Sequence, residues 1–176
     1  QMGSSSLHVN FCSPAESKLL AENDFLLRHG HQFHWINEGY DSFDDFLGQL
    51  NSRKRKAIKK ERKQLVQSGI EVKRLSGDDI KAEHWDAFYY FYKDTYDRKW
   101  GSPYMNRDTF QMFQESMRDQ IVLIMAYEDG HAIAGALNFK GSDALYGRNW
   151  GAVVDYKFLH FEVCYYQAID YAITHK

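Results

Sequence analysis

The chain has 176 residues, of which 44% are hydrophobic, so it can bury the core of an ordinary domain and is not expected to be disordered. Its net charge of −2 by itself gives no sign of a nucleic-acid partner. No apolar run approaches the roughly 20 residues of a transmembrane helix, and no signal peptide is visible. We therefore expect a soluble, cytoplasmic protein without an integral membrane segment.

The N-terminal forty residues contain short predicted elements. Ser13 followed by Pro14 has the pattern of an N-cap and a first helical residue, which predicts a helix that runs to about Asn23. Alternation of apolar and polar residues around it predicts short strands at residues 7–11, 25–28 and 32–35.

Two helical segments follow. Ser42 is a second predicted N-cap, and the helix behind it presents an apolar stripe at i, i+3, i+4 and i+7, which is expected to face the core. The stripe consists of Phe43, Phe46, Leu47 and Leu50. After a break or a new cap at Asn51 and Ser52, a second helix continues to Gly69, a residue type favoured just beyond a helix C-terminus.

Positive charge is concentrated in this second helix. Residues 53–63 contain eight basic residues and one acidic residue, a local charge of +7, while Ile58, Leu65 and Val66 are expected to pack. Two interpretations remain open: a solvated helix surface, or a site for the phosphates of tRNA, a nucleotide or a lipid-linked precursor. In the second interpretation the candidate phosphate ligands are Arg53, Lys54, Lys56 and Lys60.

The rest of the chain alternates strands and helices. The pattern predicts a strand at 70–75, helices at 81–100 and 107–118, strands at 121–127, 131–140 and 144–149, and a helix at 158–175. Asp129-Gly130 predicts a hairpin turn. The expected fold class is α/β (α+β), with a largely antiparallel central sheet flanked by helices. Because the chain stops on a helix with no strand after it, we expect further C-terminal strands to be missing.

Polar and aromatic residues gather on both sides of the turn before the last helix. Ligands of open α/β sheets bind at strand ends and helix N-termini. Glu162, near the start of this helix, is therefore a candidate general base that takes a proton from an attacking amine. His160 and Tyr146 are expected to orient the substrate. The candidate substrate-binding residues are Arg148, Trp150, Tyr165 and Gln167.

Each of these residues also has a structural interpretation. Glu162 in a first helical turn can serve the helix dipole alone. Tyr165 can belong to an amphipathic core, Trp150 can cover it, and a single histidine such as His160 is more often structural than catalytic. Neither Cys12 nor Cys164 has metal-ligand spacing, which fits thiols in a reducing compartment, and no metal site is expected.

Taken together, these segments resemble the FemAB-like family of peptidoglycan biosynthesis or recognition, within the GNAT-like acyl-N-transferase superfamily. The resemblance implies that residues 1–40 are the end of a first GNAT-like half and that residues 41–176 are most of a second. It rests on residues 5–9, 32–35, 43–47, 52–56, 145–151, 159–162 and 164–167.

The resemblance implies transfer of an acyl or aminoacyl group to an amine. Relatives of known activity take the aminoacyl group from tRNA and attach it to a peptidoglycan precursor, so tRNA or a phosphate-bearing cell-wall precursor is the expected partner of the basic helix. Leucyl/phenylalanyl-tRNA transferases are related and have a Gly-Glu-Ser-Met-Phe element entering a comparable helix. Residues 161–165 occupy that place here.

The acyl donor has two alternatives. Acetyl-CoA-dependent GNAT enzymes hold the pyrophosphate with a Gln/Arg-x-x-Gly-x-Gly/Ala loop, and residues 148–153 are one residue short of this pattern and lack its second glycine. Aminoacyl-tRNA is therefore the favoured donor, and acyl-CoA, in a CoA-dependent N-acetyltransferase, is the alternative. A further alternative is a non-catalytic module that recognises cell-wall precursors with the same fold.

Overall fold

The computed structural model describes residues 5–98 and 101–175. The chain divides into two compact units, residues 1–35 and residues 36–176. The assignment of residues 1–40 and 41–176 to two GNAT-like halves stays a prediction. Within the described ranges, no helix is long and apolar enough to cross a membrane.

In residues 5–35, the described part of the first unit, the one helix is α1 (Pro14–Ala21). The Ser13 side chain accepts a hydrogen bond from the Glu16 backbone, and the Glu16 carboxylate accepts one from the Ser13 backbone, so the predicted cap is confirmed. The predicted strands at 7–11, 25–28 and 32–35 are wrong, since residues 5–13 and 25–35 form no strand. Alternation shows which side chains could share a face, but a strand also needs a neighbouring backbone to accept its hydrogen bonds.

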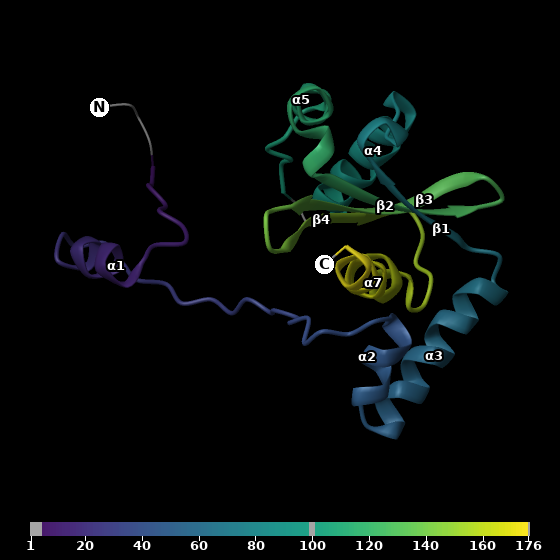
Figure 1. Cartoon of the computed structure of the whole chain (residues 1–176). Coiled ribbons are helices and arrows are strands. Elements are labelled where there is room, and N and C mark those ends of the chain that lie inside the picture. Colours follow the sequence, from purple (N-terminus) through teal and green to yellow (C-terminus); the bar gives the residue numbers. More distant parts are fainter. Residues whose placement is uncertain (1–4, 99–100, 176) are drawn as a thin grey trace. The chain divides into compact units, whose positions relative to one another are not determined.

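The second unit is built on a four-stranded antiparallel sheet (Figure 1). Its strands follow one another in chain order, each paired with the next. This arrangement confirms the predicted α/β class with an antiparallel meander and is compatible with a GNAT-like fold. The strands are β1 (Glu71–Ser76), β2 (Ile121–Glu128), β3 (His131–Lys140) and β4 (Leu145–Ala152).

Helices α4 (Ala82–Arg98) and α5 (Arg107–Met117) cover one face of the sheet, the upper face in Figure 1. Short 3-10 turns at Gly77–Asp79 and Arg118–Gln120 lie before α4 and after α5. Large rings fill this layer: Trp85, Phe88, Phe91, Tyr92 and Phe110 pack on Ile121, Leu123, Met125 and Leu137.

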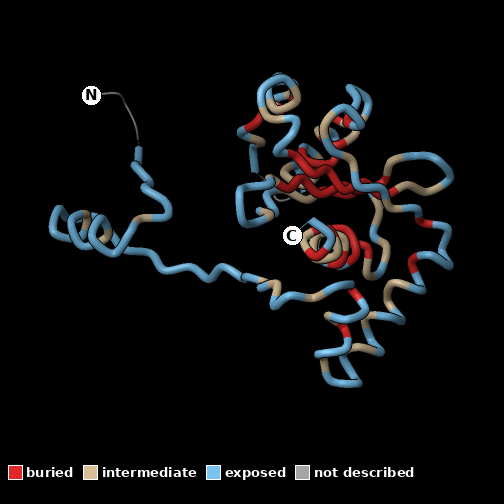
Figure 2. Tube along the Cα trace, viewed as in Figure 1, coloured by how far each residue is buried: buried red, intermediate tan, exposed pale blue. Residues whose placement is uncertain are grey.

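The opposite face is covered by the C-terminal helical segment. It begins as α6 (Leu159–Phe161), continues as a π-helical turn, η3 (Glu162–Tyr166), and ends as α7 (Gln167–Thr174). Figure 2 shows that burial is concentrated in the sheet and in this segment. The single predicted helix at 158–175 is therefore present, but a π turn interrupts its regular hydrogen bonding.

Helices α2 (Phe43–Gln49) and α3 (Ser52–Gln67) form a third cluster with the C-terminal segment. The Asn51 side chain accepts a hydrogen bond from Lys54 N at 3.0 Å, so the chain recaps between the two helices. Phe43 and Leu47 are buried against Tyr166. Val66, expected to pack, is 73% exposed. The packing side of α3 passes through Ile58 and Leu65, seven residues apart, and Val66 lies one residue round the helix.

Two glycines let α4 lie directly on the sheet. Gly135 on β3 and Gly151 on β4 are opposite each other in the register. A Cβ on Gly151 would lie 2.5 Å from the carbonyl oxygen of Phe91 in α4, and a Cβ on Gly135 would lie 2.9 Å from the ring of Phe88. The absence of a side chain at Gly151 thus lets the backbone of α4 come close, and any larger residue would push α4 away.

We predict that Gly151→Ala destabilises the second unit by about 1–3 kcal/mol, the usual cost of overpacking a filled core. Urea unfolding monitored by tryptophan fluorescence measures the change. Gly147→Ala is the matched control on the same strand, because its Cβ would be 3.5 Å from the nearest atom, Asn138 Oδ1. Equal unfolding midpoints for the two variants would contradict the close-packing account.

Candidate functional site

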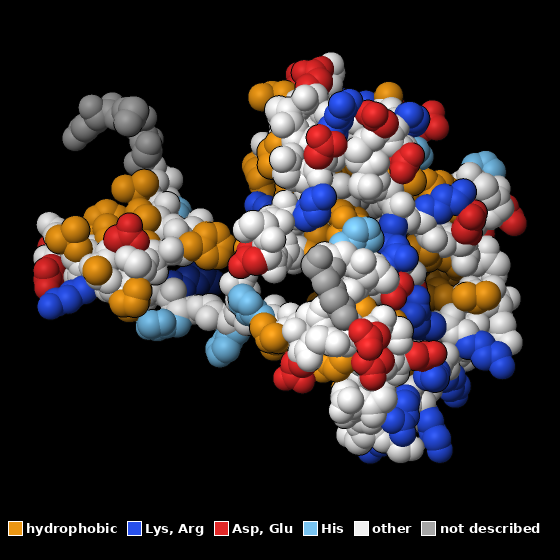
Figure 3. Space-filling model, viewed as in Figure 1, with side chains coloured by type: hydrophobic (Ala, Val, Ile, Leu, Met, Phe, Trp, Pro, Cys, Tyr) orange, Lys and Arg blue, Asp and Glu red, His pale blue; other side chains and the backbone are white. Residues whose placement is uncertain are grey.

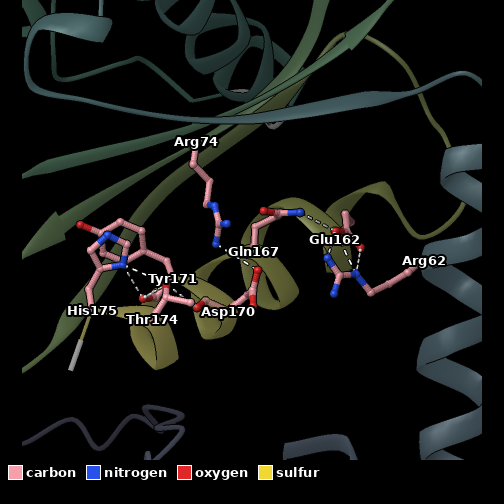
Figure 4. Close-up of polar contacts among 8 residues, drawn as sticks. All are labelled: Arg62, Arg74, Glu162, Gln167, Asp170, Tyr171, Thr174 and His175. Carbon is pink, nitrogen blue, oxygen red and sulfur yellow. Dashed lines mark hydrogen bonds and ion pairs between the residues drawn. The ribbon is translucent and has the colours of Figure 1, made fainter. Parts of the chain in front are cut away.

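Glu162 is buried and ion-paired. It is 5% exposed and lies in the π turn facing α3. Arg62 donates from Nε to both carboxylate oxygens, at 3.2 and 3.0 Å, and from Nη2 to Oε1 at 3.0 Å (Figure 4). This bidentate contact holds the carboxylate in one orientation and compensates its charge away from water.

The π turn explains why Gln167 also reaches Glu162. Gln167 Nε2 donates to Glu162 Oε1 at 2.7 Å, and the Gln167 backbone N–H bonds to the Glu162 carbonyl. In an α-helix, residues three and four apart are neighbours on one face. The wider π turn instead brings together residues that are five positions apart, such as Glu162 and Gln167. The two predicted site residues are therefore brought together by one irregular turn.

A second contact joins the π turn to α3. The Tyr166 hydroxyl donates a hydrogen bond to Glu61 at 2.5 Å. The pKa of Tyr166 is raised, mainly by burial and to a smaller extent by this hydrogen bond. The guanidinium of Arg62 also lies 4.6 Å from the centre of the Phe43 ring on α2. Neighbouring residues of α3 thus bind neighbouring parts of the C-terminal segment.

A further ion pair, also drawn in Figure 4, joins α7 to the sheet: Arg74 on β1 bonds to Asp170 at 3.1 Å. At the end of α7 the His175 ring stacks on Tyr171, with centroids 3.9 Å apart. The C-terminal helix is therefore held from two sides, by α3 at its start and by β1 along its length.

His160 contacts Trp150 and Tyr165, two other candidate site residues. The His160 ring lies edge to face with Trp150 at 5.2 Å and with Tyr165 at 5.5 Å. Phe161, which the sequence did not single out, contacts the His160 and Tyr165 rings at 5.8 and 5.9 Å. Burial lowers the pKa of His160 below its ordinary value, so the ring is largely uncharged at neutral pH.

Tyr146 and Arg148 lie apart from this group. Arg148 is an extra residue in β4, because Leu137 pairs with Asn149 while Asn138 pairs with Gly147. Because of the extra residue, a side chain before the bulge and one after it that would have shared a face of the sheet lie on opposite faces of it.

The register places Trp150 opposite Ala136, on the face covered by α7, and Tyr146 opposite Phe139, on the face covered by α4 and α5. Arg148 itself donates to the Tyr104 hydroxyl at 2.5 Å. The structure thus brings His160, Trp150 and Tyr165 into one group and leaves Tyr146 and Arg148 outside it.

The basic residues of α3 divide into two sets. Three of them have partners: Lys59 pairs with Asp44 at 2.9 Å, Arg55 donates to the Gly48 carbonyl, and Arg62 binds Glu162. Figure 3 shows basic side chains gathered where Figure 1 places α3. Within residues 5–98 and 101–175, five basic side chains of α3 form no ion pair or hydrogen bond: Arg53, Lys54, Lys56, Lys60 and Lys63.

Sequence reasoning counted Arg62 only as one of many charges. A signal for its different role was present, because Arg62 lies four residues after Ile58 and three before Leu65 and so shares the packing side of α3. Its partner lies 100 residues away in the chain and could not be inferred from spacing. Among the described residues, no group of three or more His, Cys, Asp or Glu side chains is placed to hold a metal ion.

Comparison with known proteins decides the family. The FemAB-like family, described as peptidoglycan biosynthesis/recognition, matches residues 1–176, which is the whole chain. The chain belongs to the FemAB-like family. A comparison with curated proteins finds no match. The FemAB-like assignment links the chain to peptidoglycan, and it confirms the family that the sequence segments resemble.

The geometry of this FemAB-like chain predicts that Arg62→Met destabilises it by about 3–5 kcal/mol, because Glu162 would remain buried without its counter-charge. The double variant Arg62→Met with Glu162→Met should regain most of this loss, since an apolar pair of similar volume can replace a buried ion pair. Urea unfolding midpoints give both values.

Arg118→Met is the control, because Arg118 forms an exposed ion pair with Asp78 and such pairs contribute about 0–1 kcal/mol. A loss for Arg62→Met no larger than the control value would show that the buried pair does not hold α3 to the C-terminal segment.

Proposed function

We propose that this chain is part of an N-acyltransferase that moves an aminoacyl group from aminoacyl-tRNA to an amine of a peptidoglycan precursor. The family supports the link to peptidoglycan. The observation that carries the choice of donor is the set of five basic side chains on α3 that have no protein partner among the described residues. Basic side chains without a protein partner can neutralise the phosphates of a nucleic acid, which favours its binding.

Four of the five free cations form a row. Arg53, Lys56, Lys60 and Lys63 follow at i, i+3, i+7 and i+10, so they line one side of α3 over about 15 Å. Like charges at i, i+4 cost a few tenths of a kcal/mol per pair, so helix stability alone does not favour this row. Lys54 lies outside this row, about 100° round the helix from Arg53, in an open depression at the first turn of α3. A polyanion laid along the helix would neutralise the row.

In the proposed reaction Glu162 takes the proton of the attacking amine, and His160, two residues before it, lines the approach. Arg62 and Gln167 already donate hydrogen bonds to the oxygens of the Glu162 carboxylate. The amine must therefore reach an oxygen that Arg62 or Gln167 now occupies. Tyr146 and Arg148 would contact the same substrate only around the free edge of β4, because they lie away from His160 and Trp150.

We predict that the affinity for bulk tRNA falls steeply with salt concentration, with a log–log slope of about −0.7 to −0.9 for each phosphate neutralised. Changing Lys54, Lys56 and Lys60 together to Ala should make this slope shallower by about two to three units. Filter binding or fluorescence anisotropy between 50 and 200 mM salt gives the slope.

The control is the triple variant of Lys73, Lys93 and Lys140, which removes the same charge from exposed positions on β1, α4 and β3. It should keep the wild-type slope. Identical slopes for the two triple variants would reject α3 as the phosphate site, and wild-type binding that does not depend on salt would reject tRNA as the donor.

The burial and ion pairing of Glu162 favour a second candidate, a non-catalytic module that recognises peptidoglycan precursors. A carboxylate whose oxygens already accept hydrogen bonds from Arg62 and Gln167 can serve entirely to hold α3 against the C-terminal segment. Recognition of a phosphate-bearing precursor would still use the free cations of α3. The two candidates differ in whether Glu162 must exchange a proton.

Replacing Glu162 by Gln distinguishes them. Gln keeps the shape of Glu and removes its basicity, so in the N-acyltransferase it should slow turnover about 10²–10⁴-fold at saturating substrate. Turnover is measured as transfer of a radiolabelled aminoacyl group to a soluble precursor, at a temperature where circular dichroism shows the variant to be folded. Near-wild-type turnover in the folded variant would exclude Glu162 as the base.

A further inference from the structure

Beside the ion-paired part of the site lies a group of exposed aromatic rings, which we call the aromatic shelf and define as His160, Phe161 and Tyr165. Phe161 and Tyr165 are 51% and 48% exposed, although their rings contact each other and His160. Exposed large rings that touch one another are typical of binding surfaces. The proposed acyl transfer places His160 along the approach of the amine and gives no role to Phe161 or Tyr165.

The protein holds the shelf from behind. The Phe161 ring stacks on buried Tyr166 at 6.4 Å, and Tyr166 in turn packs on Phe43 of α2 at 6.1 Å. Trp150 of β4 supports His160 from the sheet. The rings are therefore ordered before any ligand arrives, which reduces the entropy lost on binding.

The shelf also adjoins the basic helix. Tyr166, behind Phe161, donates its hydroxyl proton to Glu61 of α3. Lys54 lies seven residues before Glu61, hence on the same side of α3 and about 10 Å along its axis. Aromatic rings next to free cations are the combination with which proteins bind unpaired nucleotides: the rings stack on bases while the cations neutralise phosphates.

We propose that the aromatic shelf stacks unpaired bases of the RNA whose phosphates bind along α3. This inference rests on the proposed function and deepens it, because it assigns the single-stranded part of the donor RNA to Phe161 and Tyr165. The largely uncharged His160 ring adds a third aromatic face. Base stacking tolerates any sequence, since every base has a π face.

The test uses the whole chain and a fluorescently labelled 12-nucleotide RNA without secondary structure. The double variant Phe161→Ala with Tyr165→Ala should bind at least about fivefold more weakly than wild type, because one base–ring stack is worth about that factor or more. Its salt slope should not change, because no phosphate contact is lost. The lysine variants of α3 should show the opposite result, a changed slope.

Two further variants separate stacking from simple apolar contact and from misfolding. Phe161→Tyr with Tyr165→Phe keeps both rings and should keep the wild-type affinity. Phe161→Leu with Tyr165→Leu keeps apolar area without a π face and should bind as weakly as the alanine variant. Tyr90→Ala, a ring that is 61% exposed on α4, is the matched control and should bind as tightly as wild type.

Each contrary outcome overturns the assignment. RNA affinity unchanged in the alanine variant would mean that the rings touch no base, and wild-type RNA affinity in the leucine variant would mean that they supply apolar contact and not stacking. A loss of binding to a soluble muropeptide disaccharide with RNA binding intact would make the shelf a sugar platform. If the wild-type chain shows no salt-dependent RNA binding, the proposed donor itself fails, which is a different result from RNA binding that ignores the rings.

Discussion

The ion pair between Arg62 and Glu162 determines how the helices around the sheet fit together. Three hydrogen bonds from Arg62 hold the Glu162 carboxylate against α3, and the Glu162 side chain is almost fully buried there. Beside this contact lie the bond of Gln167 to Glu162 across the π turn and the bond of Tyr166 to Glu61. The buried pair joins α3 to the C-terminal segment. It therefore orients both the exposed cations of α3 and the exposed rings of that segment.

The basic residues of α3 fall into two groups, one that binds other parts of the protein and one that is available to a ligand. Arginine and lysine side chains that face α2 and the C-terminal segment are neutralised by Asp44, by the Gly48 carbonyl and by Glu162. The four cations of the row on the other side of the helix, and Lys54, have no ion pair or hydrogen bond among the described residues. A count of charges along the sequence cannot separate these sets, whereas the 3.6-residue period and the apolar positions Ile58 and Leu65 can. Charge on this helix is therefore partly structural and partly available to a ligand.

Local chemistry predicted most of the second unit. The caps at Ser42 and Asn51, the turn at Asp129-Gly130 and the apolar runs of β2 and β3 act over a few residues, and the structure has these elements close to the expected bounds. Strands at 7–11, 25–28 and 32–35 failed because they lack a partner backbone.

The candidate site was predicted less completely, because its contacts span long stretches of chain. One bulged residue, Arg148, puts Tyr146 and Trp150 on different faces of the sheet, and no spacing rule reveals an extra residue of this kind. The pairing of Arg62 with Glu162 depends on how α3 packs, which local patterns do not specify.

The π turn lets the C-terminal helical segment hold one residue more than a regular helix would use to reach the same point. Deleting one of residues 162–166 would therefore restore regular geometry and leave the residues that follow close to their present orientation, with Tyr171 and Ile173 in the core and Asp170 beside Arg74. Deleting a residue at the start of α7, which is regular, would instead rotate the residues that follow it by about 100°. Relatives that keep this packing should therefore differ in length at the π turn and not within α7.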